Sequence, residues 1–342
     1  MKRALFALAL ALPLAATATA ENVVINGCII KPGTLCPGVD LHHGDVSRSF
    51  LHGADLSKSD LKGANISGVY LHKTNFSQAD LSAANLEQAD MYAVNASRAK
   101  FHSANLTAAN LSHATLTETD LHWANLTMAR LEKAELRSAL LQEANLHNAR
   151  MEQVRAPRAD FFKANLNSAN LRRGDLLEAN LSEADLYKAN LTEANFLRAN
   201  LRGARLEEAQ ADSARFCGAN LTEANLKNAS LIEGDLCEAS FLKAKLNGAD
   251  MRRANLVRAQ LESADLRGAN LDSAKLSYAN LRGAKLTGTN FHRADLTGAD
   301  LTGADVSGVD LTRAILSGAT WTDGKVCVDG SRGGCRDRKE KP

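Results

Sequence analysis

The sequence predicts an all-β solenoid, a chain wound into successive coils around a narrow apolar core. Starting at Leu41, every fifth residue is apolar up to Trp321, which makes 57 positions in one register, 40 of them leucine. The residue two positions earlier is small, usually alanine, and the residue between the two is mostly asparagine or aspartate. The prediction rests on this period of five, on the small residue beside each leucine and on the lack of any insertion.

A period of five fits neither a helix nor an ordinary strand. Five residues turn an α-helix by about 500°, so successive leucines would spiral around its axis instead of forming a stripe. A strand would need alternation with a period of two, whereas the two positions after each leucine are polar. A solenoid accommodates the pattern, because each group of five residues can form one short side of a coil with two residues pointing inward.

The A-[DN]-L-x-x pattern, as in ADL at 54–56 and ANL at 104–106, resembles that of pentapeptide-repeat proteins over residues 39–321. The resemblance implies a right-handed quadrilateral parallel β-helix in which four groups of five residues form each coil. The repeat region would then contain about 14 coils, and at the spacing of parallel strands the rod would be roughly 67 Å long.

In the predicted core, a small central residue is always followed by a large one. Alanine takes the central position only three times, and each time the next central residue is phenylalanine. A small side chain beside a large one keeps the core volume roughly constant, so we interpret these pairs as packing devices and not as a ligand cavity. The pairs are Ala96/Phe101, Ala156/Phe161 and Ala211/Phe216.

Residues 1–20 are predicted to be a secretory signal peptide. Lys2 and Arg3 precede an apolar stretch at 4–14 and a small-residue cleavage pattern at 18–20, and the stretch is too short for a membrane span. A retained N-terminal anchor is the alternative. We expect an exported protein, periplasmic or extracellular, without a membrane span. Without Lys2 and Arg3 the basic residues fall from 41 to 39 and equal the 39 acidic ones, which argues against binding nucleic acid.

All six cysteines lie in the predicted mature chain, and an even number in an exported protein favours disulfides. Residues 21–38 are expected to cap the first coil, and residues 322–342 to form a closing cap and a polar tail, since open coil ends expose strand edges and core. We predict the disulfides Cys28–Cys36 and Cys327–Cys335 in these caps. Zinc is the alternative, but no nearby histidine completes a tetrahedral set in either segment.

The spacing from Cys217 to Cys237 equals four groups of five, one full coil in the implied fold, so the two cysteines would lie directly above one another on the outside. Their Cα atoms would be about 4.8 Å apart, within the disulfide range. We favour a disulfide that straps two adjacent coils, because a zinc pair would lack two further ligands.

Residues one coil apart form columns along the outside of the rod. One column is an unbroken run of asparagines whose amides can hydrogen-bond along the axis. Its members are Asn65, Asn85, Asn105, Asn125, Asn145 and Asn165. Another column is apolar where serine, threonine, glutamate or lysine is usual, and we interpret it as an interaction face. Its members are Leu177, Leu197, Cys217, Cys237 and Val257, with Phe162 and Leu242 at the same position of the next side.

Histidine is concentrated early in the chain, where eight of the nine residues lie between His42 and His147. The stacked pairs His52/His72 and His102/His122 are weak candidates for a shared divalent metal, and ordinary surface histidines are the simpler interpretation.

No catalytic arrangement, phosphate-binding loop or cofactor motif stands out, and a convex rod has no obvious cleft. We therefore expect a non-enzymatic exported scaffold that binds a protein partner, or itself, along a lateral face. One alternative is a DNA-mimicking protein that protects topoisomerases (gyrase), a role known in the resembled family, which the export signal and the neutral charge oppose. The other alternative is metal binding by the stacked histidines.

Overall fold

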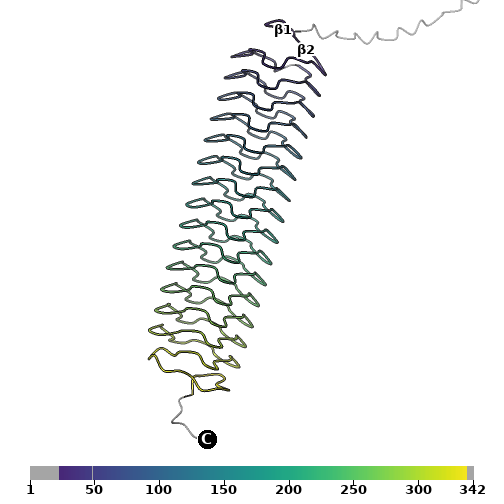
Figure 1. The fold of residues 1–342 in the computed structure, drawn as a ribbon. Coiled ribbons are helices and arrows are strands. Elements are labelled where there is room, and N and C mark those ends of the chain that lie inside the picture. The colour runs from purple at the N-terminus through teal and green to yellow at the C-terminus, as the bar shows by residue number, and fades with distance from the viewer. Residues whose placement is uncertain (1–22, 48, 337–342) are drawn as a thin grey trace, which may run out of the picture.

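The computed structural model describes residues 23–47 and 49–336, and in it the chain forms a rod of coils stacked along one axis (Figure 1). The first and the last described residues lie at opposite ends of the rod. The predicted signal peptide at 1–20 lies outside the described residues. The all-β fold class is confirmed, although most of the pairing consists of single bridges and not of long strands.

Each coil consists of four groups of five residues, as the resemblance implied. The parallel bridges all join equivalent positions in successive coils, from Leu35↔Asp55 to Asp300↔Thr320, and the bridged positions recur every five residues. Two backbone bonds surround each bridge: the N–H of Leu56 donates to the carbonyl of Asn75, and the N–H of Asn75 donates to the carbonyl of Ala54, both at 2.8 Å. Four sides per coil follow directly, because each coil contributes four bridged positions.

A tight turn forms each corner between two sides. The N–H of Ala54 donates to the carbonyl of Leu51 (3.0 Å), so His52 and Gly53 are the two central residues of the turn. The second central residue has positive φ, here 66°, as in a type II turn. The aspartate or asparagine before each central apolar residue completes the corner, since Asp55 Oδ1 accepts the N–H of Ser57 (3.0 Å).

The core runs the length of the rod and consists of the central apolar residue and the small residue of each side. Almost all of these side chains are buried, including the three predicted alanine–phenylalanine pairs. Phe196 and Phe216 lie one coil apart with their rings stacked at 4.8 Å. A few polar side chains replace the small alanine and remain satisfied, as when Thr74 Oγ1 donates to the carbonyl of Leu51 (2.7 Å).

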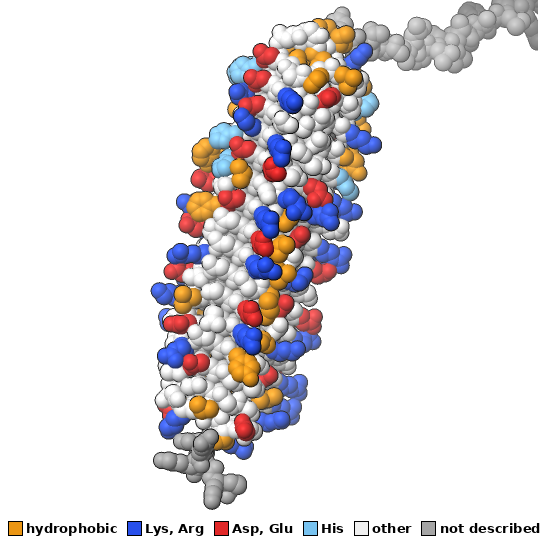
Figure 2. All heavy atoms as spheres, viewed as in Figure 1, with side chains coloured by type: hydrophobic (Ala, Val, Ile, Leu, Met, Phe, Trp, Pro, Cys, Tyr) orange, Lys and Arg blue, Asp and Glu red, His pale blue; other side chains and the backbone are white. Residues whose placement is uncertain are grey.

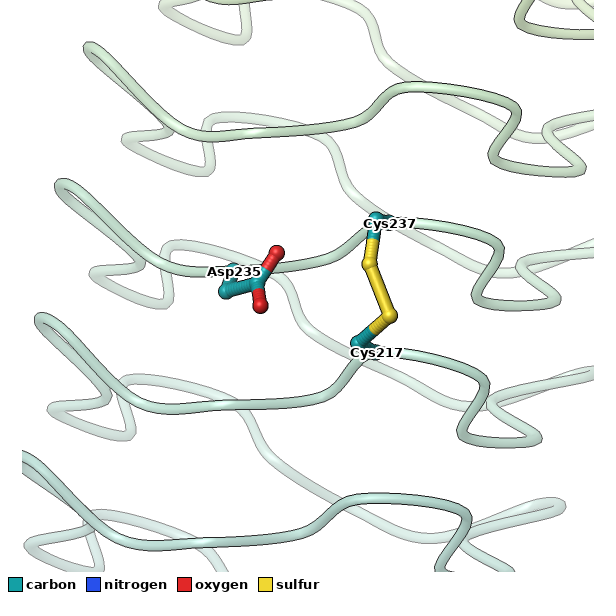
Figure 3. A group of neighbouring side chains, drawn as sticks. All are labelled: Cys217, Asp235 and Cys237. Carbon is teal, nitrogen blue, oxygen red and sulfur yellow. A yellow bond between two sulfur atoms is a disulfide. The ribbon is translucent and has the colours of Figure 1, made fainter.

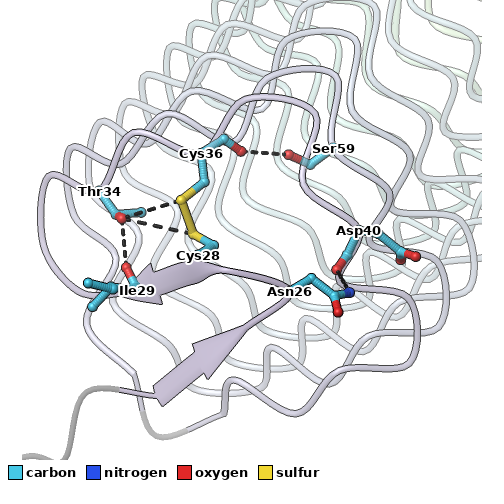
Figure 4. Close-up of a disulfide and its surroundings, with 7 residues drawn as sticks. All are labelled: Asn26, Cys28, Ile29, Thr34, Cys36, Asp40 and Ser59. Atoms are coloured by element: carbon cyan, nitrogen blue, oxygen red, sulfur yellow. Dashed lines mark hydrogen bonds between the residues drawn. A yellow bond between two sulfur atoms is a disulfide. The ribbon is translucent and has the colours of Figure 1, made fainter.

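An antiparallel hairpin of β1 (Val23–Ile25) and β2 (Cys28–Ile30) covers the first coil (Figure 4). Asn26 and Gly27 both have positive φ, as a type I′ hairpin turn requires. A disulfide joins Cys28 to Cys36, and Asn26 Nδ2 donates to the carbonyl of Asp40 (2.6 Å). The hairpin is thus fixed to the repeat region by one covalent and one polar contact.

The other end of the rod closes with antiparallel bridges between Ile315 and Arg332 and between Thr320 and Val326. A disulfide joins Cys327 to Cys335 with the Cα atoms 5.0 Å apart. Cys327 is buried, and Trp321 packs against the end of the core. The chain therefore covers both ends of the apolar core with short, disulfide-closed segments.

Candidate functional site

The apolar column consists of Leu177, Leu197, Cys217, Cys237 and Val257, which occupy the same outward position in five consecutive coils. Backbone bonds link each member to the next, since the residue after one member donates to the carbonyl of the following member. The N–H of Glu178 donates to Leu197 (3.0 Å), and that of Gly218 donates to Cys237 (2.8 Å). All five residues are part-buried.

For three of the five members, Leu177, Leu197 and Val257, the residue two positions earlier holds the turn that presents the side chain outward. Asp175 Oδ1 accepts the N–H of Leu177, and Asn195 Oδ1 accepts that of Leu197, both at 3.3 Å. These bonds, together with the backbone bonds between the coils, fix the backbone at these three positions, so the direction of their side chains is set before any partner arrives.

Charged residues follow the apolar column along one edge. Glu178 lies between Arg158 (2.9 Å) and Arg198 (3.5 Å), and Glu238 pairs with Arg258 (3.8 Å). These pairs are exposed and contribute about 0–1 kcal/mol each to stability. Together with the column they form an apolar strip with a polar rim, the usual composition of an interface. Figure 2 shows hydrophobic side chains along the middle of the visible face, between charged ones.

Phe162 and Leu242, the two other predicted members of the interaction face, lie on the next side of the coil and are also part-buried. The N–H of Phe162 donates to Asp160 Oδ1 (3.0 Å), and Lys163 Nζ lies 5.0 Å from the centre of the Phe162 ring. They are two separate apolar positions and do not extend the column itself.

A disulfide joins Cys217 and Cys237 within the column, with the Cα atoms 4.6 Å apart. Figure 3 shows the carboxylate of Asp235 beside this disulfide, on the coil of Cys237. The possible ligand atoms of Cys217, Asp235 and Cys237 lie within 4.8 Å of one another, and no other group of three such residues occurs in the described part of the chain.

The four histidines proposed as weak metal candidates contact neighbouring side chains. His72 lies between Tyr70 Oη and Asp90 Oδ2, both at 2.7 Å, and His122 contacts Asp120 Oδ1 (3.0 Å). His52 packs against the ring of Tyr70, with centroids 5.9 Å apart, and His102 packs against Trp123, with centroids 4.9 Å apart. The rings therefore belong to a mixed aromatic surface, and Figure 2 shows histidines gathered near the N-terminal end of the rod.

Several large apolar side chains outside the predicted interaction face are more exposed than the apolar column. Phe50 (59% exposed), Trp123 (53%) and Met128 (56%) project much further than any member of the apolar column. Phe50 takes a position where aspartate or asparagine is usual, and Trp123 and Met128 take the positive-φ corner position. A search of all three outward positions, and not only of the one after each leucine, could have found them.

The predicted asparagine ladder is present in a modified form. Asn85 Nδ2 donates to Asn65 Oδ1 (3.2 Å), and Asn105 Nδ2 donates to Asn85 Oδ1 (3.1 Å). Further along, Asn125 and Asn145 each donate to a threonine hydroxyl of the preceding coil, at 2.9 Å. The column is therefore a structural feature in which short hydroxyl side chains relay some of the contacts.

Comparison with known protein families identifies the repeat pattern. A family model described as pentapeptide repeats (8 copies) matches overlapping segments between residues 38 and 318. No curated protein matches the chain. Within residues 23–47 and 49–336, no helix has the length and apolar character that crossing a membrane requires.

Several solved structures are similar to the chain at low TM-scores. QnrB1, a plasmid-mediated fluoroquinolone resistance protein, is 19% identical over 50% of this chain and 85% of its own, with a TM-score of 0.32. HetL, involved in heterocyst differentiation regulation in the cyanobacterium Nostoc sp. strain PCC 7120, is 28% identical over 81% of this chain and 91% of its own, with a TM-score of 0.14. A protein of the Arabidopsis thaliana thylakoid lumen is 29% identical over 30% of this chain and 83% of its own, with a TM-score of 0.19.

Proposed function

The chain belongs to the pentapeptide-repeat family, whose members fold as right-handed quadrilateral β-helices, and on this basis we propose that it is an exported, non-catalytic scaffold that binds a protein along one lateral face. The apolar column carries this proposal. It is a strip about 20 Å long at the spacing of parallel strands, with ion pairs along one edge.

The regular core supports a binding role. The inward positions are almost all apolar and buried, and the few inward threonines, such as Thr74, donate their hydroxyls to backbone carbonyls, so these positions offer little to a ligand. Function must then depend on outward residues, and the column is where these depart furthest from the serine and threonine of other coils. The preformed backbone of the column would lower the cost of binding, because little ordering is needed when the partner arrives.

Export is supported by the predicted signal peptide and by the three disulfides, which are typical of oxidising compartments. Mimicry of DNA is not favoured, because the charges beside the column alternate in sign along the axis. Arg158, Glu178 and Arg198 are one such series.

The test compares the wild-type mature chain with the paired variant Leu177→Thr/Leu197→Ser. Serine and threonine occupy this column in other coils, as at Ser97 and Thr117, so the variant should unfold at the same urea concentration as the wild type. Sedimentation velocity at rising concentration measures self-association, and recovery of a tagged chain from its own host measures binding to other proteins. Whether the wild type binds itself or another protein, we expect the variant to bind at least tenfold more weakly.

Leu140→Asn is the matched control, because Leu140 is an exposed leucine in another column, where Asn180 is also found. It should bind like the wild type. Equal binding by the paired variant and the wild type, or equal losses in the paired variant and the control, would contradict a role for the apolar column.

A further inference from the structure

Cys217, Cys237 and Asp235 lie together on the side of the rod, and the fold does not depend on this group. Both caps have disulfides whose inner cysteines, Cys28 and Cys327, are almost fully buried at 2% and 1% exposure. The cap disulfides also lie at the two ends of the rod. Cys217 and Cys237, by contrast, are both part-buried on the side of the rod, where solvent and a reductant can reach them.

The coils around the Cys217–Cys237 disulfide are held together without it. The N–H of Gly218 donates to the carbonyl of Cys237 (2.8 Å), and the backbones of Arg215 and Asp235 form a parallel bridge. Coils elsewhere in the rod have the same bonds and no disulfide. Opening this bond therefore leaves the fold intact and places two thiols on adjacent coils, with their Cα atoms 4.6 Å apart.

The carboxylate of Asp235 differs from its counterparts in the same column. Asp175, Asn195 and Asn255 each accept the N–H of the residue two positions later, at 3.3 Å. Within the described residues, Asp235 makes no such bond with the amide of Cys237. Its Oδ1 accepts Asn255 Nδ2 (2.8 Å), which orients the carboxylate beside the two sulfurs.

From this geometry we propose that the reduced pair Cys217/Cys237, together with Asp235, binds one zinc ion, so that the site alternates between a disulfide and a metal-bound dithiolate. Two thiolates and a carboxylate are ordinary zinc ligands, and three protein ligands leave the fourth position of the tetrahedron to water. Sulfurs bound to one zinc lie about 3.8 Å apart at the usual bond length, a separation that the adjacent coils permit.

Electrons and protons balance in both steps. A dithiol reductant transfers two electrons and two protons to the disulfide, which gives two cysteine thiols and the disulfide of the reductant. Zinc then displaces one proton from each thiol, so binding to the two sulfurs releases two protons. In the reverse direction, thiol–disulfide exchange with an oxidised dithiol transfers two electrons from the two thiolates to that disulfide, which takes up two protons and becomes a dithiol, while zinc is expelled and the strap between the coils re-forms.

The experiment uses the mature chain, treated with a phosphine reductant at neutral pH without denaturant and then freed of the reductant under anaerobic conditions. Alkylation and intact mass should show two free thiols, and peptide mapping should place them at Cys217 and Cys237. Calorimetric titration with Zn²⁺ should give one site in the reduced chain and none in the oxidised chain. Co²⁺ should give a thiolate-to-metal charge-transfer absorption in the reduced chain only.

Asp235→Asn should weaken zinc binding at least tenfold, on the scale seen when groups around a metal are removed. Asp175→Asn is the matched control, because Asp175 Oδ1 accepts Asn195 Nδ2 at the same 2.8 Å but has no cysteine beside it. It should bind zinc like the wild type. The double variant Cys217→Ser/Cys237→Ser, which retains both cap disulfides, should bind none.

Three results would overturn the proposal. The first is a Cys217–Cys237 disulfide that resists reduction in the folded chain. The second is a reduced chain that takes up no zinc. The third is zinc binding that is equal in Asp235→Asn and Asp175→Asn, or that persists in the double cysteine variant.

Discussion

At the scale of single residues, the corners of the rod adopt a backbone conformation that most side chains avoid. The second central residue of each described corner has positive φ from His43 to Gly318, and most of these residues are not glycine. The left-handed region costs an L-residue roughly 1–2 kcal/mol. A bond to the next coil offsets this cost, since the N–H of Ala83 (φ 56°) donates to the carbonyl of His102 (2.8 Å). The corner conformation is therefore a consequence of stacking.

Aspartates before the central residues link stability to pH. Hydrogen bonds from the hydroxyls of Ser307 (2.7 Å) and Thr287 (2.8 Å), and from the N–H of Ser307, hold the pKa of Asp305 below its ordinary value. The side-chain and backbone hydrogen bonds of Thr312 lower the pKa of Asp310 in the same way. Because the folded state favours the ionised form, this contribution is complete above the unfolded pKa of about 3.9 and is lost as the pH falls through the lower folded values.

We therefore predict that the urea midpoint of unfolding is flat between about pH 7 and pH 5 and falls below about pH 4. Carboxyl NMR titration should place the pKa of Asp305 below its ordinary value, and Ser307→Ala should raise it because one donor is lost. A pKa of Asp305 that is the same in the wild type and in Ser307→Ala would show that this hydroxyl is not the cause.

At the scale of a coil, the fit of small residues between neighbouring coils decides which substitutions are accepted. A Cβ atom added at Gly174 would lie 3.2 Å from Leu176 Cδ1 and 3.3 Å from Val154 Cγ1, and Val154 is one coil away. At Gly234 the residue one coil away is Ala214. Apart from the turn carbonyl of Leu231, the atom nearest to an added Cβ is the carbonyl oxygen of Ala214, at 3.6 Å. The two glycines take the same inward position in different surroundings.

Gly174→Ala should therefore lower the free energy of unfolding by about 1–3 kcal/mol through overpacking. Gly234→Ala, its matched control, should be neutral or raise it by up to about 1 kcal/mol, because the unfolded chain loses freedom. Urea unfolding measures both. Adding Val154→Ala to Gly174→Ala should recover most of the loss, and a double variant no more stable than Gly174→Ala would argue against the contact with Val154.

The sequence predicts the inward residues of each coil well, because these positions need only fill the apolar core. A period of five with one large and one small apolar residue favours a solenoid with both residues inward, and the resemblance to pentapeptide-repeat proteins implies four such groups per coil. The register and the alanine–phenylalanine pairs agree with the structure. Outward positions are less constrained. Thr107 interrupts the asparagine ladder because its hydroxyl accepts the bond from Asn125 Nδ2 (2.9 Å) and itself donates to Asn105 Oδ1 (2.6 Å), an arrangement that no spacing reveals.

The candidate surface was predictable in position but not in exposure. Residues one coil apart must stack, so the sequence identifies Leu177 and Leu197 as neighbours. The stacking that makes them neighbours also covers much of each side chain. The carboxylate of Asp235 beside the cysteines was not foreseen, because aspartate is the commonplace residue at that position and only its missing bond to Cys237 distinguishes it.

At the scale of the whole molecule, the stability of the rod depends on its buried core and backbone bonds, whereas the binding that we propose depends on outward residues. The buried ladder and core repeat from coil to coil, as in other solenoids whose stability is a sum over neighbouring units. Outward residues can therefore change without loss of fold, and a single face can be altered for a partner. The apolar column in the second half of the repeat region and the aromatic, histidine-rich surface in the first half are two places where the outside of the described rod departs from its polar pattern.

The most direct test of the lateral-face proposal is photo-crosslinking from position 197 of the mature chain in its native compartment. A photo-reactive residue at Leu197 should give one discrete product whose mass equals the chain plus a single protein, or two copies of the chain. The same residue at Ser97, in the same column but outside the apolar stretch, should not give that product. Failure to obtain a discrete product from position 197, or the same products from both positions, would contradict binding along this face.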